Sequence, residues 1–194
     1  EYIKIHSCKG IKYAFISYTT KTNSITAPKG KEYLVNIYSN ETAKNDIEKI
    51  RKDVDVVIIS MHWGTEYTFK PDKEQRDIAK YLSENGADII IGHHPHVVQP
   101  IEFINNTIVI YSLGNFIACQ DGNYDYKRIG GMLSFDIEKH TNTIKITNIS
   151  PKLSYIFYDE NKRNFEILPI SMWNNKIHNY KELISKYMNI FKLA

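Results

Sequence analysis

Two short motifs concentrate the histidines of this sequence. Four of the seven histidines fall in Ser60–Gly64, which reads SMHWG, and in Gly92–His96, which reads GHHPH. Imidazole is the commonest metal ligand and binds in its neutral form, which dominates near pH 7. Residues i and i+2 of a strand point to the same side, so His94 and His96 can reach one site together. The pattern predicts a metal site with His62, His94 and His96 as ligands.

The competing interpretation of each histidine is structural. A lone histidine after a strand is usually a hydrogen-bonded structural residue, so the prediction depends on both motifs ending neighbouring strands. His93 points away from His94 in an extended strand, which favours a supporting or substrate-facing role over direct ligation. The remaining histidines lie in polar contexts and are interpreted as ordinary surface residues: His6, His140 and His178.

The elements around the motifs indicate how the histidines are brought together. Val54–Met61 is an almost unbroken β-branched run, as expected of a strand buried on both faces. A helix is predicted over Asp72–Glu84, and a second buried strand over Asp88–Ile91. Strand, helix and strand of these lengths form a βαβ unit whose strands are parallel neighbours. Ligands bind at the carboxyl edge of such sheets, where both histidine motifs fall.

The rest of the chain reads as one mixed α/β domain over residues 1–194. Hydrophobic spacing predicts a helix from Asn40 to Ile50 and another over Tyr180–Leu193. Alternation and turn residues predict the remaining strands, which are Tyr2–Ile5, Lys12–Tyr18, Glu32–Tyr38, Ile101–Ile104, Thr107–Ser112, Gly131–Ile137, Thr143–Ile149 and Lys152–Tyr158.

Composition excludes several classes of protein. The formal charge is +3, and its 25 basic and 22 acidic residues are intermixed. No Lys/Arg block of the kind that binds nucleic acid is present, so no nucleic-acid partner is expected. No apolar stretch reaches the ~18 residues of a membrane span. Cys8 and Cys119 lack zinc-type spacing; we interpret them as buried free thiols, with one disulfide as the alternative in an oxidising compartment.

Three segments carry a resemblance to a known family. VDVVIISMHWGTEY, then Gln75, then GADIIIGHHPHVVQPIE and IVIYSLGNF resemble the CapA-type poly-γ-glutamate capsule synthesis proteins, within the calcineurin-like metallophosphoesterase superfamily. The resemblance covers about residues 54–116. It implies part of a four-layer sandwich, with mixed β-sheets flanked by helices. It also implies His62, His94 and His96 as ligands of a divalent metal ion, Zn, Mn or Fe.

The resemblance implies a role in poly-γ-glutamate capsule biosynthesis with a metal-dependent hydrolase site. His93, Glu66 and Asn115 are then the candidate catalytic residues. A solvated carboxylate is an equal alternative for Glu66, and a loop-capping role is favoured for Asn115. The superfamily takes further ligands from N-terminal Asp, Gly-Asp and Asn-His motifs, which this sequence lacks. We therefore expect the chain to begin partway through the fold and to be inactive alone.

A second interpretation belongs to another functional class. The same fold can serve as a non-catalytic partner that binds or exports the capsule polymer. Expected partners are poly-γ-glutamate or another anionic polymer, other capsule-synthesis membrane proteins, and either a second copy or a complementing N-terminal chain. The expected location is the extracellular face of the cell membrane, with the anchor outside this sequence.

Overall fold

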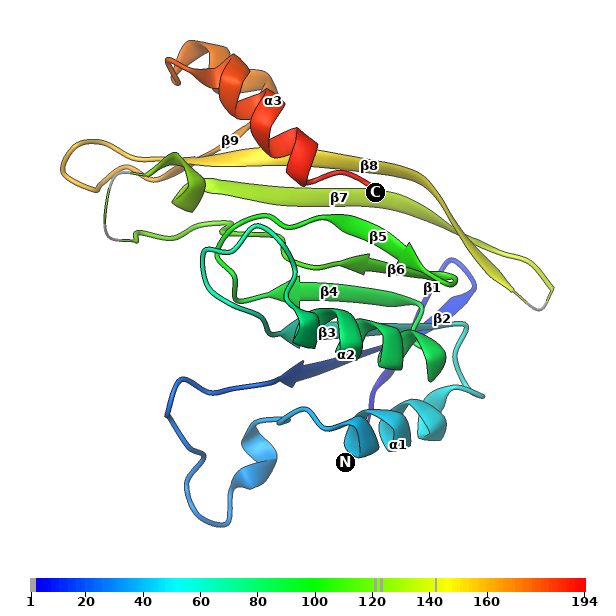
Figure 1. Cartoon of the computed structure of the whole chain (residues 1–194). Helices are drawn as coiled ribbons and strands as arrows, with labels where there is room; N and C mark the ends of the chain where they lie inside the picture. The colour runs from blue at the N-terminus through cyan, green and yellow to red at the C-terminus, as the bar shows by residue number, and fades with distance from the viewer. Residues whose placement is uncertain (1–2, 121, 123, 142) are drawn as a thin grey trace.

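The computed structural model describes residues 3–120, 122, 124–141 and 143–194. A six-stranded sheet has the order β1-β2-β3-β4-β6-β5, and a three-stranded sheet has the order β7-β8-β9. Figure 1 shows α1 and α2 below the first sheet, the second sheet above it, and α3 outermost. The predicted mixed α/β class is confirmed.

The elements are β1 (Ile5–Cys8), β2 (Ile11–Thr19), α1 (Asn40–Ile50), β3 (Val56–His62), α2 (Lys73–Glu84), β4 (Ile89–His93), β5 (Ile101–Ile104), β6 (Thr107–Ile110), β7 (Ile129–Lys139), β8 (Ile144–Phe157), β9 (Glu166–Pro169) and α3 (Tyr180–Ile190).

Strand β3 is buried on both faces, which explains its continuous apolar sequence. Val57, Ile59 and Met61 pack into the core beneath α1 and α2. Val56 faces the opposite way, into the core shared with the three-stranded sheet and α3. Side chains of a strand alternate between faces, so only a run that is apolar at every position can serve both cores.

The predicted βαβ unit is confirmed, and a second one precedes it. Strands β3 and β4 pair in parallel, and β2 pairs in parallel with β3 on the other side. The register aligns Thr19 with His62 and His62 with His93. The carboxyl ends of three parallel strands therefore form one row at a single edge of the sheet.

Two expectations are wrong in detail. Glu32–Tyr38 is not a strand: Glu32–Leu34 forms a 3-10 helix with no buried residue, so no sheet surface covers it. The two strands expected on either side of Pro151 are one strand, β8. Strand β9 pairs with β8 only from Ser154 onward, so Pro151 lies where its missing N–H leaves no gap in the β8–β9 ladder.

The ends of the chain differ from expectation in smaller ways. The predicted first strand begins at Tyr2, outside the described residues, and the observed strand is β1. Cys8 and Cys119 are free thiols as expected, but both are exposed rather than buried.

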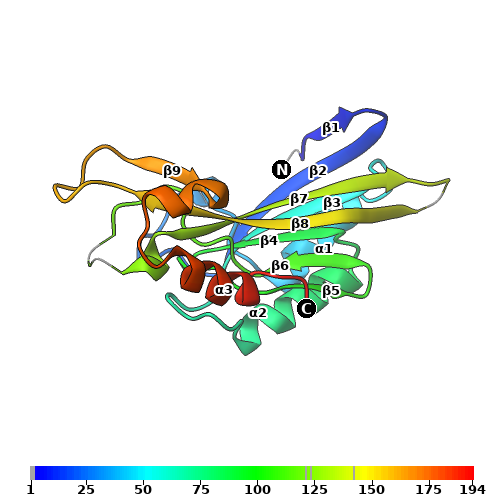
Figure 2. The same ribbon diagram turned by 90° about the horizontal axis from the view of Figure 1, so that it is seen from above.

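Seen from above, the β1–β2 hairpin and β7 extend toward the same end of the molecule (Figure 2). The cavity between them measures about 700 Å³, and Ile11, Tyr13 and Phe135 are among the residues that line it.

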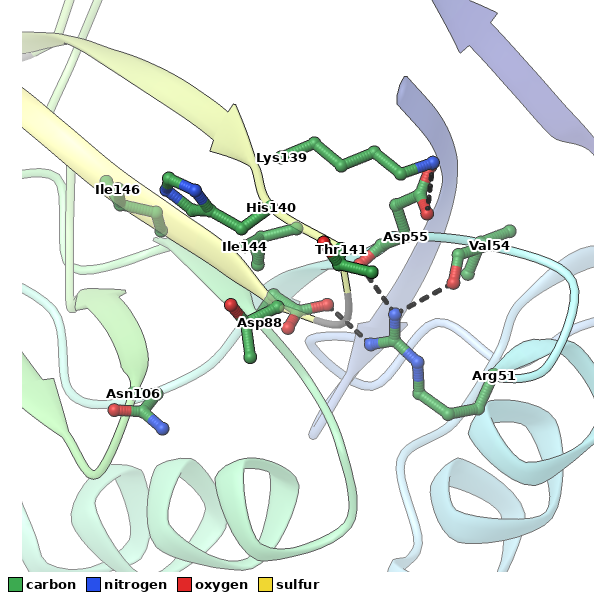
Figure 3. Close-up of a pocket in the computed structure, with 11 residues that line it drawn as sticks. Arg51, Val54, Asp55, Asp88, Asn106, Lys139, His140, Thr141, Ile144 and Ile146 are labelled. Atoms are coloured by element: carbon green, nitrogen blue, oxygen red, sulfur yellow. Dashed lines mark hydrogen bonds and ion pairs between the residues drawn. The ribbon is translucent and has the colours of Figure 1, made fainter. Parts of the chain in front are cut away.

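Arg51 fixes the edge of the sheet opposite the histidines. Its guanidinium donates to the carbonyls of Gly86 (3.0 Å), Val54 (3.0 Å) and Asp55 (2.7 Å) and pairs with Asp88 (Figure 3). The Asp88 carboxylate also accepts from the Val57 N–H at 2.7 Å. One side chain thus joins the end of α1 to the starts of β3 and β4. The adjoining cavity of about 450 Å³ is lined by charges that are already paired with each other.

We expect Arg51→Met to lower the free energy of unfolding by about 2 kcal/mol, because it leaves the partly buried Asp88 carboxylate without its cation. Lys73→Met, which breaks the exposed pair with Asp77, is the matched control and is expected to cost at most ~1 kcal/mol. Urea unfolding measures both. Equal losses in the two variants would contradict the role given to Arg51.

Candidate functional site

The site begins at the carboxyl ends of β2, β3 and β4. The Thr20 N–H donates to the His62 carbonyl at 3.0 Å, and the Trp63 N–H donates to the His93 carbonyl at 3.2 Å. These bonds extend the sheet pairing one residue beyond the strand ends. The first histidine motif is therefore held on one side by the chain leaving β2 and on the other by β4.

A left-handed turn, and not strand alternation, presents the second motif. Strand β4 ends at His93, and His94 and His96 have φ values of 96° and 61°. Residues with a side chain adopt positive φ rarely, so two such histidines in three residues constitute local strain. The expectation that His94 and His96 share a side because they belong to one strand is wrong in its reasoning, although both remain beside the motif of β3.

The three predicted ligands lie near one another but do not form a complete set of metal ligands. The ring centroids of His62 and His94 are 4.4 Å apart, and those of His94 and His96 are 6.2 Å apart. Within the described part of the chain, no group of three or more His, Cys, Asp or Glu side chains is close enough to hold a metal ion. The shared metal site therefore stays a prediction.

Hydrogen bonds fix the tautomers of two of these rings. The Thr19 hydroxyl donates its single hydrogen to the Lys21 carbonyl at 2.6 Å, so it accepts from Nδ1–H of His62 at 2.9 Å. The Asn115 amide donates through Nδ2 to the Lys127 carbonyl at 2.8 Å, which turns its Oδ1 toward Nδ1 of His96, also at 2.8 Å. Both imidazoles then carry their lone pair on Nε2, where a metal ion would bind.

His94 contains a buried nitrogen without a partner. The side chain is only 8% exposed, and its Nε2 has no hydrogen-bond partner among the described residues. Burial lowers the pKa of His94 to about 4, with smaller contributions from His62 and the Lys21 ammonium. Burial, and then Lys21, also lower the pKa of His62. Both rings are thus neutral near pH 7, as metal ligation requires.

The candidate catalytic residues occupy different positions. Glu66 is exposed on the loop after the first motif, and its charge acts to raise the pKa of both His62 and His94. His93 is also exposed, at the end of β4. Asn115 is buried, and its two amide contacts make it a positioning residue for His96.

Thr19 and Lys21 belong to the site, although neither was predicted from the histidine motifs. Lys21 donates from Nζ to the Gly64 carbonyl at 2.9 Å, beside the first motif. Tyr67, with a φ of 59°, stacks on His96 at 5.8 Å between ring centroids. The signal that could have found Thr19 is the second βαβ unit, because it places the end of β2 next to His62.

A buried pair of amides supports the loop that carries Tyr67. Gln75 caps α2 together with Asp72, and its Nε2 donates to Oε1 of Gln99 at 2.8 Å. The Gln99 Nε2 donates in turn to the Thr68 carbonyl at 2.7 Å. Gly64 has φ +82°, and a Cβ there would lie 2.6 Å from the Gln75 side chain. The amide pair therefore links the segments that follow the two histidine motifs to the start of α2.

Trp63 and Tyr111 form the floor beneath the motifs, as expected of packing residues. Both are fully buried, and the Trp63 indole donates to the Tyr111 carbonyl at 2.9 Å. A Cβ on Gly92 would lie 1.9 Å from that carbonyl and 2.5 Å from the indole nitrogen. Only glycine therefore allows β4 to approach this closely.

The three histidines fit in part the divalent metal ion that the resemblance implies. The unpartnered Nε2 of His94 and the Nε2 lone pairs of His62 and His96 are suitable donors. Within the described residues, these histidines and their acidic or thiol neighbours do not form a group of three that is close enough to hold the ion. The fit is that of a partial ligand set.

This fold and site define the class of protein. The family model described as "Bacterial capsule synthesis protein PGA_cap" matches residues 1–120, a stretch that contains Asn115 and the three predicted histidine ligands. The chain belongs to this family.

Particular relatives narrow the comparison. The chain is 40% identical over 104 residues to the PGA biosynthesis protein CapA of Bacillus subtilis, which covers 53% of this chain and 27% of that protein. It is 48% identical over 68 residues to the capsule biosynthesis protein CapA of Bacillus anthracis, covering 35% of this chain and 16% of that one. A "Probable polyglutamine synthesis accessory protein" of Mycobacterium tuberculosis is 30% identical over 94 residues, covering 48% and 23%. The matched part thus spans about a quarter or less of each relative.

We expect Gln75→Leu to destabilise the fold by ~1–3 kcal/mol, because it leaves the buried Gln99 carbonyl oxygen without a donor. Gln99→Leu is expected to cost a similar amount. The double variant should cost less than the sum by about 1 kcal/mol, since the two amides are each other's partners. Urea unfolding of the wild type, the two single variants and the double variant completes a double-mutant cycle. Strictly additive losses of unfolding free energy would show that the two amides are not coupled.

We expect the metal-free protein to lose stability as the pH falls from about 6.5 toward about 4. The pKa of His94 is lowered from 6.5 to about 4 in the folded chain, so the unfolded chain binds more protons in this window. His94→Gln should reduce the difference between urea midpoints at about pH 7.5 and about pH 5. His178→Gln, an exposed control, should keep the wild-type difference. An unchanged difference in His94→Gln would refute the assignment.

Proposed function

We propose that this chain belongs to a protein of poly-γ-glutamate capsule biosynthesis that carries a metal-dependent hydrolase site of the metallophosphoesterase type. Membership of the capsule synthesis family and the names of the relatives support the biological role. The observation that carries the metal site is the buried, unpartnered Nε2 of His94 next to His62. A buried polar atom without a partner is rare in proteins, and a bound metal ion would satisfy this one.

In this proposal His62, His94 and His96 hold a divalent ion, Zn, Mn or Fe. Such an ion would supply Lewis-acid chemistry to a phosphoryl or acyl centre. Thr19 and Asn115 bind Nδ1 of His62 and of His96, so Nε2 of each ring would be left to hold the ion. Glu66 and His93 are exposed at the same edge, where either can exchange a proton with a bound substrate.

The second candidate function is a non-catalytic partner that binds or exports the polymer. It is favoured by the incomplete ligand set within the described residues. Turnover of a generic phosphodiester by the metal-loaded full-length protein would decide for the hydrolase. Binding of the polymer with no turnover would decide for the partner.

Partners and location belong to the same proposal. We place the protein with other capsule-synthesis membrane proteins, at the extracellular face of the cell membrane. Within the described residues, no helix combines the length and apolarity needed to cross a membrane. A second copy or a complementing chain is the proposed neighbour of the β1–β2 hairpin, on which Ile5 and Phe15 are 39% and 49% exposed.

We expect His62→Ala, His94→Ala and His96→Ala each to weaken Zn²⁺ or Mn²⁺ binding by more than about 100-fold, because each removes a ligand. His93→Ala is expected to weaken it by only ~10–100-fold, as residues that orient ligands do. Calorimetric titration and the metal content of the purified protein by mass spectrometry measure this, with His178→Ala as the control. A wild-type protein that binds neither ion refutes the metal site. Equal losses for His93→Ala and His96→Ala would show that the ligands are assigned wrongly.

A further inference from the structure

Lys21 is held by two sets of contacts beside His62 and His94, which are called the histidine pair below. Its backbone is tied to the Thr19 hydroxyl, which donates to the Lys21 carbonyl at 2.6 Å and accepts from its N–H at 3.3 Å. Its Nζ donates to the Gly64 carbonyl at 2.9 Å. The same hydroxyl binds the ring of His62, so the ammonium and the imidazole are positioned by one residue.

The Lys21 charge reaches both rings of the pair. It acts on His62 and His94 to disfavour their protonated forms, whereas Glu66 acts in the opposite sense. An ammonium has three N–H donors, and the contact with the neutral Gly64 carbonyl uses one of them without cancelling the charge. A cation held in place beside two neutral imidazoles attracts an anion.

We propose that Lys21 is a specificity-determining residue that binds an anionic oxygen, from a carboxylate or a phosphate, of the ligand bound at His62 and His94. The inference rests on the proposed function in one respect, namely that the ligand reaches the histidine pair. The unpartnered Nε2 of His94 provides the second, independent indication that a ligand enters here. A charge-assisted hydrogen bond from Nζ to the anion is shorter and stronger than the bond to a neutral acceptor.

The test compares anion binding with metal binding in the same variants. A γ-linked glutamate oligomer and inorganic phosphate are titrated separately by calorimetry into the wild type, Lys21→Gln, Lys21→Arg and Lys44→Gln. Lys44→Gln is the matched control, since it removes the same charge from an exposed position on α1, where Lys44 pairs with Glu48. Zn²⁺ and Mn²⁺ titrations of the four proteins provide a readout that does not depend on the anion.

We expect Lys21→Gln to weaken binding of at least one anion about tenfold at low ionic strength, as loss of a hydrogen bond from a charged donor does. Added salt should narrow the difference. Lys21→Arg and Lys44→Gln should bind as the wild type does, and the metal affinity of Lys21→Gln should not fall. Which anion responds identifies the source of the oxygen.

Three results overturn the proposal: a wild type that binds neither anion, a Lys21→Gln variant that keeps the wild-type affinity for both anions, or a Lys44→Gln variant that loses as much affinity as Lys21→Gln. The proposed function fails separately. If anion binding depends on Lys21 in a protein that binds no metal, the metal-dependent hydrolase is contradicted and the role of Lys21 is supported. If the protein binds metal but its anion affinity does not depend on Lys21, the role of Lys21 is contradicted and the metal site is supported.

Discussion

The parallel register of β2, β3 and β4 is the constraint on which the site depends. It places Thr19, His62 and His93 in one row at the carboxyl edge of the sheet. Thr19 can bind Nδ1 of His62 only because the two residues are paired across adjacent strands. A shift of one residue in this register would turn the side chain of His62 to the other face. The two cores on either side of β3 prevent that shift, because each takes alternate side chains of the same strand.

Beyond the strand ends, polar contacts replace sheet pairing. The Gln75–Gln99 pair, the Trp63 indole and the Asn115 amide each bind a backbone carbonyl of a neighbouring segment. Backbone at the edge of a sheet has no partner strand to satisfy it, so buried side chains must supply the hydrogen bonds. The loops around the histidines are thus held by the same kind of bond as the sheet. Arg51 performs the corresponding task at the opposite edge.

Sequence patterns predict the strands and helices that carry the site better than they predict the side-chain contacts within it. The β-branched run of β3, the capping residues Asp72 and Gln75 and the turn between β5 and β6 each follow from local chemistry, which long-range packing does not overturn. The left-handed conformations of His94 and His96 do not, because positive φ at residues other than glycine is imposed by the surroundings. The arrival of Lys21 beside Gly64 depends on the pairing of β2 with β3, 43 residues apart along the chain. Such contacts follow from the parallel pairing of β2 with β3, which the predicted strand Lys12–Tyr18 does not indicate by itself.

Backbone strain and an unpartnered buried atom at the carboxyl edge of the sheet favour a ligand site over a structural cluster. His94, His96 and Tyr67 all have positive φ, and each such residue costs of order 1–3 kcal/mol where the conformation is unfavourable. The buried Nε2 of His94 adds the cost of a polar atom without a partner. The hydrogen bonds within the cluster do not offset the cost at His94, because they engage Nδ1 of His62 and Nδ1 of His96. A ligand that satisfies Nε2 and engages the Lys21 charge would offset them, and the strain then acts to hold the three rings ready for it.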